Sequence, residues 1–217
     1  VEKYNGKILS GFSRKPTSTN TLLKIAKRMY RPVGCRGPFT YDFLTGAGIK
    51  AKLIGCPTMF NPEKDSQEEY IAFSFSRDNL PLQVKVLKSI CKSNKVNVVL
   101  HEAYEHKWVN GIDVEKVSDP KDFLKIYARA RYVVTGRLHG VLPSLNNKPV
   151  FFFQSNRKFD SRLTILAFIK IPIRHISEIP SIDLSKVEYD TEKVLQLKSA
   201  FADYTHWFKK NFCGVSN

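Results

Sequence analysis

The feature that most constrains the fold is a wholly apolar run, PVFFF at residues 149–153, which follows a second strand-like run, RYVVT at residues 131–135. Strands that are apolar on both sides are buried on both faces, which is typical of parallel sheets covered by helices. The same order of strand, polar or glycine-bearing loop and helix recurs from residue 70 onward. The sequence therefore predicts an α/β fold built on an open parallel sheet.

Periodicity and capping signals predict the other elements of this region. Residues 81–92 place their apolar side chains on one helical face. Asp119 followed by Pro120 is a typical helix start, with a capping side chain before a proline in the first turn. Further strands are expected at residues 70–75, 96–100 and 173–176, and further helices at 120–130, 161–169 and 191–212. Trp207 and Phe208 on the last helix are expected to face the core.

The region before residue 65 is less regular. Strands are expected at residues 33–35 and 52–55, a helix begins within residues 40–45, and residues 57–69 have the composition of an interdomain linker. The chain does not begin with Met and has no apolar signal-peptide core, which indicates a fragment or a processed product. We therefore expect an incomplete first α/β domain plus linker at residues 1–65, a second domain at 66–190 and an amphipathic helix at 191–217.

Composition and charge narrow the possible classes of function but do not select one of them. The 217 residues carry a formal charge of +15, from 35 Lys and Arg against 20 Asp and Glu, and 42% of them are apolar, so the chain is a folded protein. The basic residues are dispersed from Lys3 to Lys210, which argues against a specific nucleic-acid site and equally suits an enzyme acting on anions. No apolar run reaches the roughly 18 residues of a membrane span. Four separated cysteines are expected to be reduced thiols: Cys35, Cys56, Cys91 and Cys213.

The loop TGRLHG at residues 135–140 carries the strongest chemical signal. It follows a buried strand, and ligands of open parallel sheets bind outside the carboxyl ends of the strands. Gly136 and Gly140 let the backbone approach a ligand, Arg137 can bind a carboxylate or phosphate with two hydrogen bonds, and His139 can transfer a proton near neutral pH. The alternative is structural: Arg137 pairs with an acidic neighbour and His139 is a half-buried imidazole. The combination between glycines favours function.

At this loop the sequence resembles the polysaccharide pyruvyltransferase family, whose members carry a strand followed by a TGRLHG-type turn. Residues 33–40 (VGCRGPFT) are similar to the family's G-x-R-G/D-x-x-[ST] segment, and residues 54–58 (IGCPT) to its GCPS variant. The strand at residues 149–153 leading to Lys158 is similar to the family's strand, loop and lysine. The similarity spans about residues 33–160 in the same order, which is more specific than any one turn.

The resemblance implies two Rossmann-like halves in a glycosyltransferase-B-like arrangement, with substrates in the cleft between them. It also implies a transferase that moves pyruvyl from phosphoenolpyruvate to hydroxyls of a sugar, forming a ketal, with no cofactor or metal. The acceptor is then a polysaccharide or glycan, which can be lipid-linked. We expect a cytoplasmic protein, or one that contacts the inner face of the membrane.

The donor's chemistry matches residues of this sequence. Phosphoenolpyruvate carries a carboxylate and a phosphate, for which the guanidinium groups of Arg36 and Arg137 are suitable, with Lys158 as a third charge. His139, with an ordinary pKa near 6.5, is the expected general acid or base. The resemblance assigns catalysis to His139 and Arg137, and substrate binding to Arg36, Arg137, Leu138 through its backbone, His139, Gly140 and Lys158.

Two further residues follow strands and join the predicted binding site. Arg77 comes after the strand at residues 70–75 and can face the same cleft, although it can equally pair with Asp78 or cap the next helix. His101 follows the strand at residues 96–100 and is expected in the cleft. Its segment HEAYEH, residues 101–106, does not have the H-E-x-x-H spacing of a zinc site, so no metal is expected.

Two other function classes remain open at this point. A glycosyltransferase of the B type would use the same cleft for a nucleotide sugar, with Arg137 and Lys158 on the pyrophosphate. A non-catalytic basic module would bind nucleic acid or anionic lipid with strong salt dependence and without saturation by a small molecule.

Overall fold

The computed structural model describes residues 23–24, 27–28, 32–60, 67–77, 79–153 and 161–212. The chain divides into two compact units that each combine segments distant in sequence. The first unit consists of Val1–Pro57, Arg157–Ile169 and Asp190–Asn217, and the second of Thr58–Asn156 and Lys170–Tyr189. Each unit is described by itself below.

The second unit is built on a six-stranded, wholly parallel sheet in the order β5-β4-β3-β6-β7-β8. The strands are β3 (Glu68–Ser74), β4 (Val96–Val99), β5 (Glu115–Val117), β6 (Ala130–Thr135), β7 (Pro149–Phe153) and β8 (Ile173–His175). The chain runs outward from β3 to β5, then returns to the other side of β3 and continues outward from β6 to β8. This is the Rossmann strand order, in which the direction of winding reverses between β3 and β6.

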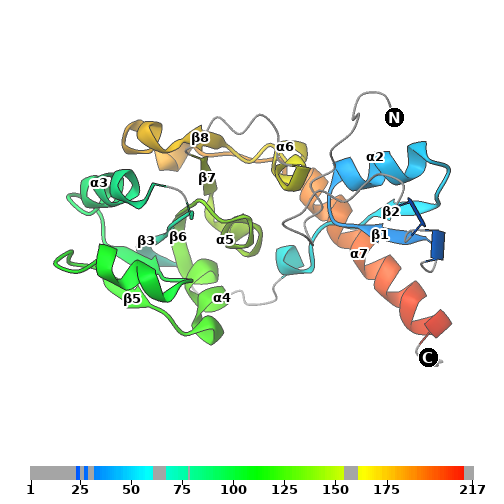
Figure 1. The fold of residues 1–217 in the computed structure, drawn as a ribbon, viewed down its shortest axis with the longest axis horizontal. Coiled ribbons are helices and arrows are strands. Elements are labelled where there is room, and N and C mark those ends of the chain that lie inside the picture. The colour runs from blue at the N-terminus through cyan, green and yellow to red at the C-terminus, as the bar shows by residue number, and fades with distance from the viewer. Residues whose placement is uncertain are drawn as a thin grey trace. The chain divides into compact units, whose positions relative to one another are not determined.

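Helices cover both faces of this sheet (Figure 1). On one face, α3 (Leu80–Ile90) and the 3₁₀ helix η6 (Ile176–Ser181) contribute to the main core, where the rings of Phe73 and Phe152 stack at 5.7 Å. On the other face, α4 (Pro120–Arg129) places the fully buried ring of Tyr127 against the strands. The sheet is therefore apolar on both faces, as the run at residues 149–153 predicted.

Short helices connect the strands at the end where the site lies. They are η3 (Ala103–Trp108) between β4 and β5, and α5 (Leu138–Val141) followed by η4 (Leu142–Asn147) between β6 and β7. After the last strand, η6 is followed by η7 (Leu184–Lys186). The predicted start of α4 is confirmed: the Asp119 side chain accepts a hydrogen bond from the Lys121 amide at 2.9 Å, and Pro120 is the first helical residue.

The first unit contains β1 (Val33–Cys35) and β2 (Ala51–Leu53), paired in parallel. Its helices are α2 (Pro38–Gly46), η5 (Ser161–Leu163), α6 (Thr164–Phe168) and the long α7 (Thr191–Phe212), and η2 (Pro57–Phe60) spans the change from first to second unit. The expectation that α7 turns its aromatic residues to the core holds in part: Trp207 is half-buried beside Tyr204, whereas Phe208 is 39% exposed. Helices in the described part of the chain are all too short or too polar to cross a membrane.

The division of the chain differs from the one expected from sequence order. The terminal helix is part of the first unit rather than a separate element, because the Gly34 amide donates a hydrogen bond to Tyr204 Oη on α7 at 3.2 Å. Residues 161–169, expected in the second domain, also belong to the first unit, where Gly37 lies against Thr164 of α6. The expected helix at residues 161–169 is shorter and begins with a 3₁₀ turn, and the edge strand β5 was not expected at all.

Candidate active site

Three loops of the second unit meet beside the point where the sheet reverses its winding. They follow β3, β4 and β6, which are adjacent strands with Ser74 level with both Val99 and Thr135. Because these parallel strands end at the same edge, the residues just after them gather there. They are Phe75, Ser76 and Arg77 after β3, His101, Glu102 and Glu105 after β4, and Gly136 to His139 after β6.

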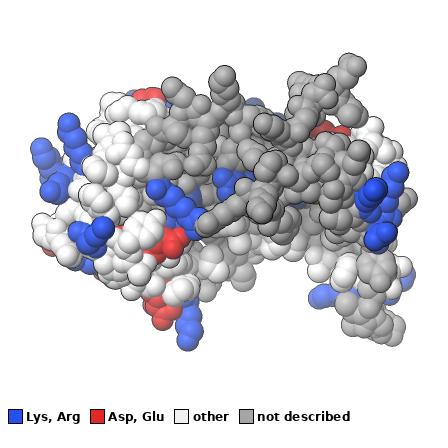
Figure 2. All heavy atoms as spheres, viewed as in Figure 1, with Lys and Arg blue, Asp and Glu red and all other residues white. Residues whose placement is uncertain are grey.

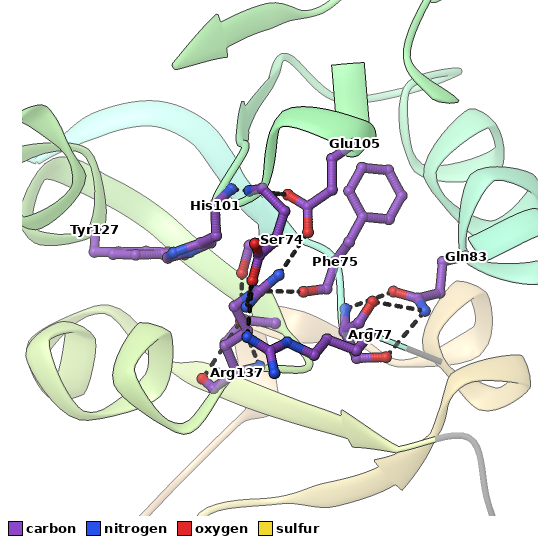
Figure 3. Close-up of polar contacts among 11 residues, drawn as sticks. Ser74, Phe75, Arg77, Gln83, His101, Glu105, Tyr127 and Arg137 are labelled. Atoms are coloured by element: carbon purple, nitrogen blue, oxygen red, sulfur yellow. Dashed lines mark hydrogen bonds and ion pairs between the residues drawn. The ribbon is translucent and has the colours of Figure 1, made fainter. Parts of the chain in front are cut away.

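Arg137 is the centre of this cluster, and its guanidinium joins all three loops (Figure 3). Its Nε donates to the carbonyl oxygen of Phe75 at 2.8 Å, and its Nη2 donates to Glu105 Oε1 at 2.5 Å. Nη1 lies 3.8 Å from Glu102 Oε1, beyond hydrogen-bond distance. The Arg137 side chain is 17% exposed, so its position is fixed by protein contacts while part of the fork remains accessible.

The sequence left open a structural role in which Arg137 pairs with an acidic residue, and Glu105 is such a partner. Its side chain is fully buried and accepts hydrogen bonds from the His101 amide at 2.8 Å and the Glu102 amide at 3.3 Å, besides the one from Arg137. The ion pair does not use all of Arg137, because the two Nη1 hydrogens form no hydrogen bond within the described part of the chain. Glu105 was not among the predicted site residues, because its only local signal is its spacing of three from Glu102 in a capping box.

His101 lies at the same edge and is held in the neutral form. Its Nε2 is 3.0 Å from the hydroxyl oxygen of Tyr127, and its ring packs 4.6 Å from Phe123 (Figure 3 shows the Tyr127 ring beside it). Burial, and secondarily the positive charge of Arg137, lower the pKa of His101 to about 4. Burial raises the pKa of Tyr127, which therefore stays a neutral phenol. Two neutral groups thus form one hydrogen bond beside Arg137.

Gly136 and Gly140 are required by close packing. A Cβ at Gly136 would lie 2.5 Å from Ser76 Cβ and 2.8 Å from Phe152 Cε2, and one at Gly140 would lie 2.8 Å from Thr135 Oγ1. Buried Gln83 holds the loop after β3, because its Oε1 accepts a hydrogen bond from the Ser76 amide at 2.7 Å. The sequence predicted that these glycines permit close approach, and the close neighbours are parts of the protein itself.

Arg77 and His139 are the more accessible side chains of the cluster. Arg77 is 63% exposed and its Nη2 donates to Glu102 Oε1 at 2.9 Å; His139 is exposed. Arg77 therefore pairs with Glu102 from the neighbouring loop, a partner that no local pattern of the sequence indicates. On the face shown in Figure 2, Lys and Arg side chains of the described part of the chain stand in separate groups, some of them beside acidic groups.

The remaining predicted site residues are placed as follows. Leu138 is half-buried and Gly140 is buried at the start of α5, both next to the cluster in sequence. Arg36 is half-buried in the first unit, directly after β1. Lys158 lies outside the described residues. The structure therefore brings together Arg77, His101, Arg137 and the Leu138–Gly140 turn, and the assignment of a function to each stays a prediction.

The described residues include no group of three His, Cys, Asp or Glu side chains placed to hold a metal ion. In the segment HEAYEH, Glu105 is directed to Arg137 and His106 is exposed, which separates the two. Burial raises the pKa of the Cys35 thiol to about 11, so this residue stays protonated at neutral pH.

A Rossmann-ordered parallel sheet with charged residues at its switch point defines a class of α/β proteins that bind ligands at the carboxyl edge. Within that class, this chain belongs to the polysaccharide pyruvyl transferase family, whose sequence model matches residues 1–157. No curated protein sequence matches the chain significantly.

Several solved structures resemble the fold, including the following two. One is the UDP-GlcNAc 2-epimerase of Methanocaldococcus jannaschii in complex with UDP-GlcNAc and UDP, with 10% identity and a TM-score of 0.51 over 80% of this chain and 59% of that one. The other is a proposed UDP-N-acetylglucosamine 2-epimerase from Listeria monocytogenes, with 10% identity and a TM-score of 0.53 over 85% of this chain and 60% of that one. Both support the predicted glycosyltransferase-B-type α/β fold, and this chain spans about three fifths of their length.

Proposed function

We propose that this protein transfers a pyruvyl group from phosphoenolpyruvate to two hydroxyls of a sugar in a polysaccharide or glycan, forming a ketal and releasing phosphate. The observation that carries the proposal is that Arg77 and Arg137 meet at Glu102 at the switch point of the second unit, with exposed His139 two residues after Arg137, in a chain of this family. In this proposal phosphoenolpyruvate is the donor and no further cofactor takes part.

Donor binding is assigned to the two arginines. Arg137 is held by Phe75 and Glu105, so it loses little conformational freedom when it binds a ligand through Nη1. Arg77 is exposed and can adjust its position to a second anionic group. A ligand with both a carboxylate and a phosphate uses two such cations. Arg36 and Lys158 remain proposed further contacts, Leu138 contributes its backbone, and Gly140 keeps the turn closely packed.

The reaction needs three proton movements, for which His139 is proposed as the main acid and base. Protonation of the methylene carbon of phosphoenolpyruvate converts it to a methyl group and leaves a cationic centre, which one sugar hydroxyl attacks with loss of its proton. The second hydroxyl, also losing a proton, then displaces phosphate: the bond between carbon and the phosphate oxygen breaks, and the departing phosphate takes up the remaining proton. An exposed imidazole can donate and accept these protons near pH 7. His101 has no extra proton to donate near pH 7, because its pKa is about 4. It serves as a neutral hydrogen-bonding group.

The proposed partner is a sugar or glycan acceptor, free or lipid-linked. A lipid-linked acceptor would bring the protein to the inner face of the membrane, which is where we place it if the acceptor is of that kind. Otherwise we place it in the cytoplasm.

A binding and turnover experiment tests the proposal. Thermal stabilisation is measured on titrating phosphoenolpyruvate, UDP-GlcNAc and inorganic phosphate, since a ligand that binds the native state raises its stability. We expect saturable stabilisation by phosphoenolpyruvate. His139→Asn should retain this binding but lose phosphate release with an acceptor glycan, and Arg137→Gln should lose both. Saturation by UDP-GlcNAc alone would favour a nucleotide-sugar enzyme, and full phosphate release by both variants would refute the site.

A further inference from the structure

We infer that Glu102 is an exchangeable anion that occupies the place of a donor group between Arg77 and Arg137, and that donor binding displaces it. Its Oε1 lies 2.9 Å from Arg77 Nη2 and 3.8 Å from Arg137 Nη1. One carboxylate oxygen thus stands between two guanidinium groups that arrive from different loops. The inference rests on the proposed function, because it assumes that these arginines receive the donor.

The two carboxylates of this segment differ in a way that separates their roles. Glu105 is fully buried and accepts two backbone hydrogen bonds in addition to the one from Arg137. Removing it from Arg137 would leave a buried carboxylate without its charge partner, which is strongly unfavourable. Glu102 is 32% exposed and pairs with an arginine that is 63% exposed. An exposed ion pair of this kind contributes little, because water solvates both ions after separation.

Charge balance explains what the exchange would do. Arg77 and Arg137 carry two positive charges, and Glu102 and Glu105 carry two negative ones, so the four groups sum to zero when His101 is neutral. Neighbouring Arg77 lowers the pKa of Glu102, which keeps this carboxylate ionised at neutral pH. An incoming anion gains a net positive field only if Glu102 moves away from the arginines.

This arrangement selects for the number of anionic groups in the ligand. A single carboxylate only replaces the Glu102 carboxylate and gains little beyond it. A compact ligand with a carboxylate and a phosphate replaces Glu102 at one arginine and adds a second contact at the other. Glu102 is therefore proposed as a specificity residue that favours compact ligands with two anionic groups over simple carboxylates.

The test uses Glu102→Gln, which removes the charge but keeps a side-chain oxygen for the start of η3. The matched control is Glu69→Gln, because Glu69 on β3 forms an exposed ion pair with Arg131 on β6 near the amino ends of these strands, away from the site at their carboxyl ends. Binding of phosphoenolpyruvate, pyruvate and inorganic phosphate is measured by calorimetry at low salt. We expect Glu102→Gln to bind phosphoenolpyruvate about tenfold more tightly and to bind pyruvate measurably, and Glu69→Gln to match the wild type.

A second background separates a charge effect from a change in loop structure. In Arg77→Gln protein, the gain from Glu102→Gln should become smaller, because one of the two cations that Glu102 occupies has been removed. If wild type binds phosphoenolpyruvate and Glu102→Gln binds it equally or more weakly, the inference is overturned while the proposed function stands. If neither the wild type nor Glu102→Gln binds phosphoenolpyruvate, both are overturned.

Discussion

Replacing Glu105 by Gln is the most direct test of how the candidate site is held together. The Gln carbonyl can still accept from the His101 and Glu102 amides, but its NH₂ group would then face Arg137 Nη2, donor against donor. The variant therefore removes the charge partner of Arg137 with little change in side-chain volume. Breaking a buried ion pair by removing one partner costs about 3–5 kcal/mol.

The structure places the expected loss at the lower end of that range. Arg137 keeps its bond to the Phe75 carbonyl and is 17% exposed, so water solvates part of the unpaired charge. We expect the free energy of unfolding to fall by about 3 kcal/mol. At about 2–4 °C per kcal/mol for a protein of this size, the melting temperature should fall by roughly 6–12 °C.

Urea and thermal unfolding of purified protein measure this loss, and the chain offers a matched control. Glu178 occupies the same capping-box position in η6, where its Oε1 accepts from the His175 amide at 3.1 Å, but it is exposed. Glu178→Gln should change stability by less than about 0.5 kcal/mol. The reasoning fails if Glu105→Gln loses under about 1 kcal/mol, or no more than the control does.

Two further predictions concern the neighbours of Arg137. The Cβ added by Gly136→Ala would push against Ser76 and the Phe152 ring, so the free energy of unfolding in urea should fall by about 1–3 kcal/mol. Gly46→Ala is the control, because its Cβ would lie in open space and should not lower the stability. Equal effects of the two substitutions would contradict the packing argument. Because the pKa of His101 in the folded protein is about 4, below its unfolded value of about 6.5, its contribution to stability is complete above about pH 6.5 and declines as the pH falls toward 4. His101→Gln should flatten the stability profile between these values by up to about 1.4 kcal/mol per pH unit, and a profile parallel to that of wild type would show that His101 protonates freely in the folded state.

Much of the second unit was predictable because its signals are local. The run at residues 149–153 coincides with β7, and Asp119 with Pro120 marks the start of α4. The loop after β6 was placed at the carboxyl edge by the order of strand and loop alone, since parallel strands end there together. The short edge strand β5, Glu115–Val117, escaped notice because it has three residues, two of them charged.

The acidic half of the site was not predictable from local pattern. Glu105 stands in a polar segment that resembles an ordinary surface turn, and its burial depends on Arg137, 32 positions later. Arg77 was expected to face the cleft or, equally, to pair with Asp78 or cap a helix, and none of these expectations named Glu102, 25 positions away, which it contacts. Such pairings depend on the order of strands in the sheet, which the sequence does not state.

The sequence by itself determined the elements, the parallel α/β class and the position of Arg137 and His139 after a buried strand, because periodicity, capping and strand–loop order act over a few residues. Only the tertiary structure decided which charges meet and which segments belong together, including the placement of α7 with β1 through Gly34 and Tyr204, 170 positions apart. Charge pairing and packing depend on distance in space, and residues far apart in the chain become neighbours only when the sheet has formed.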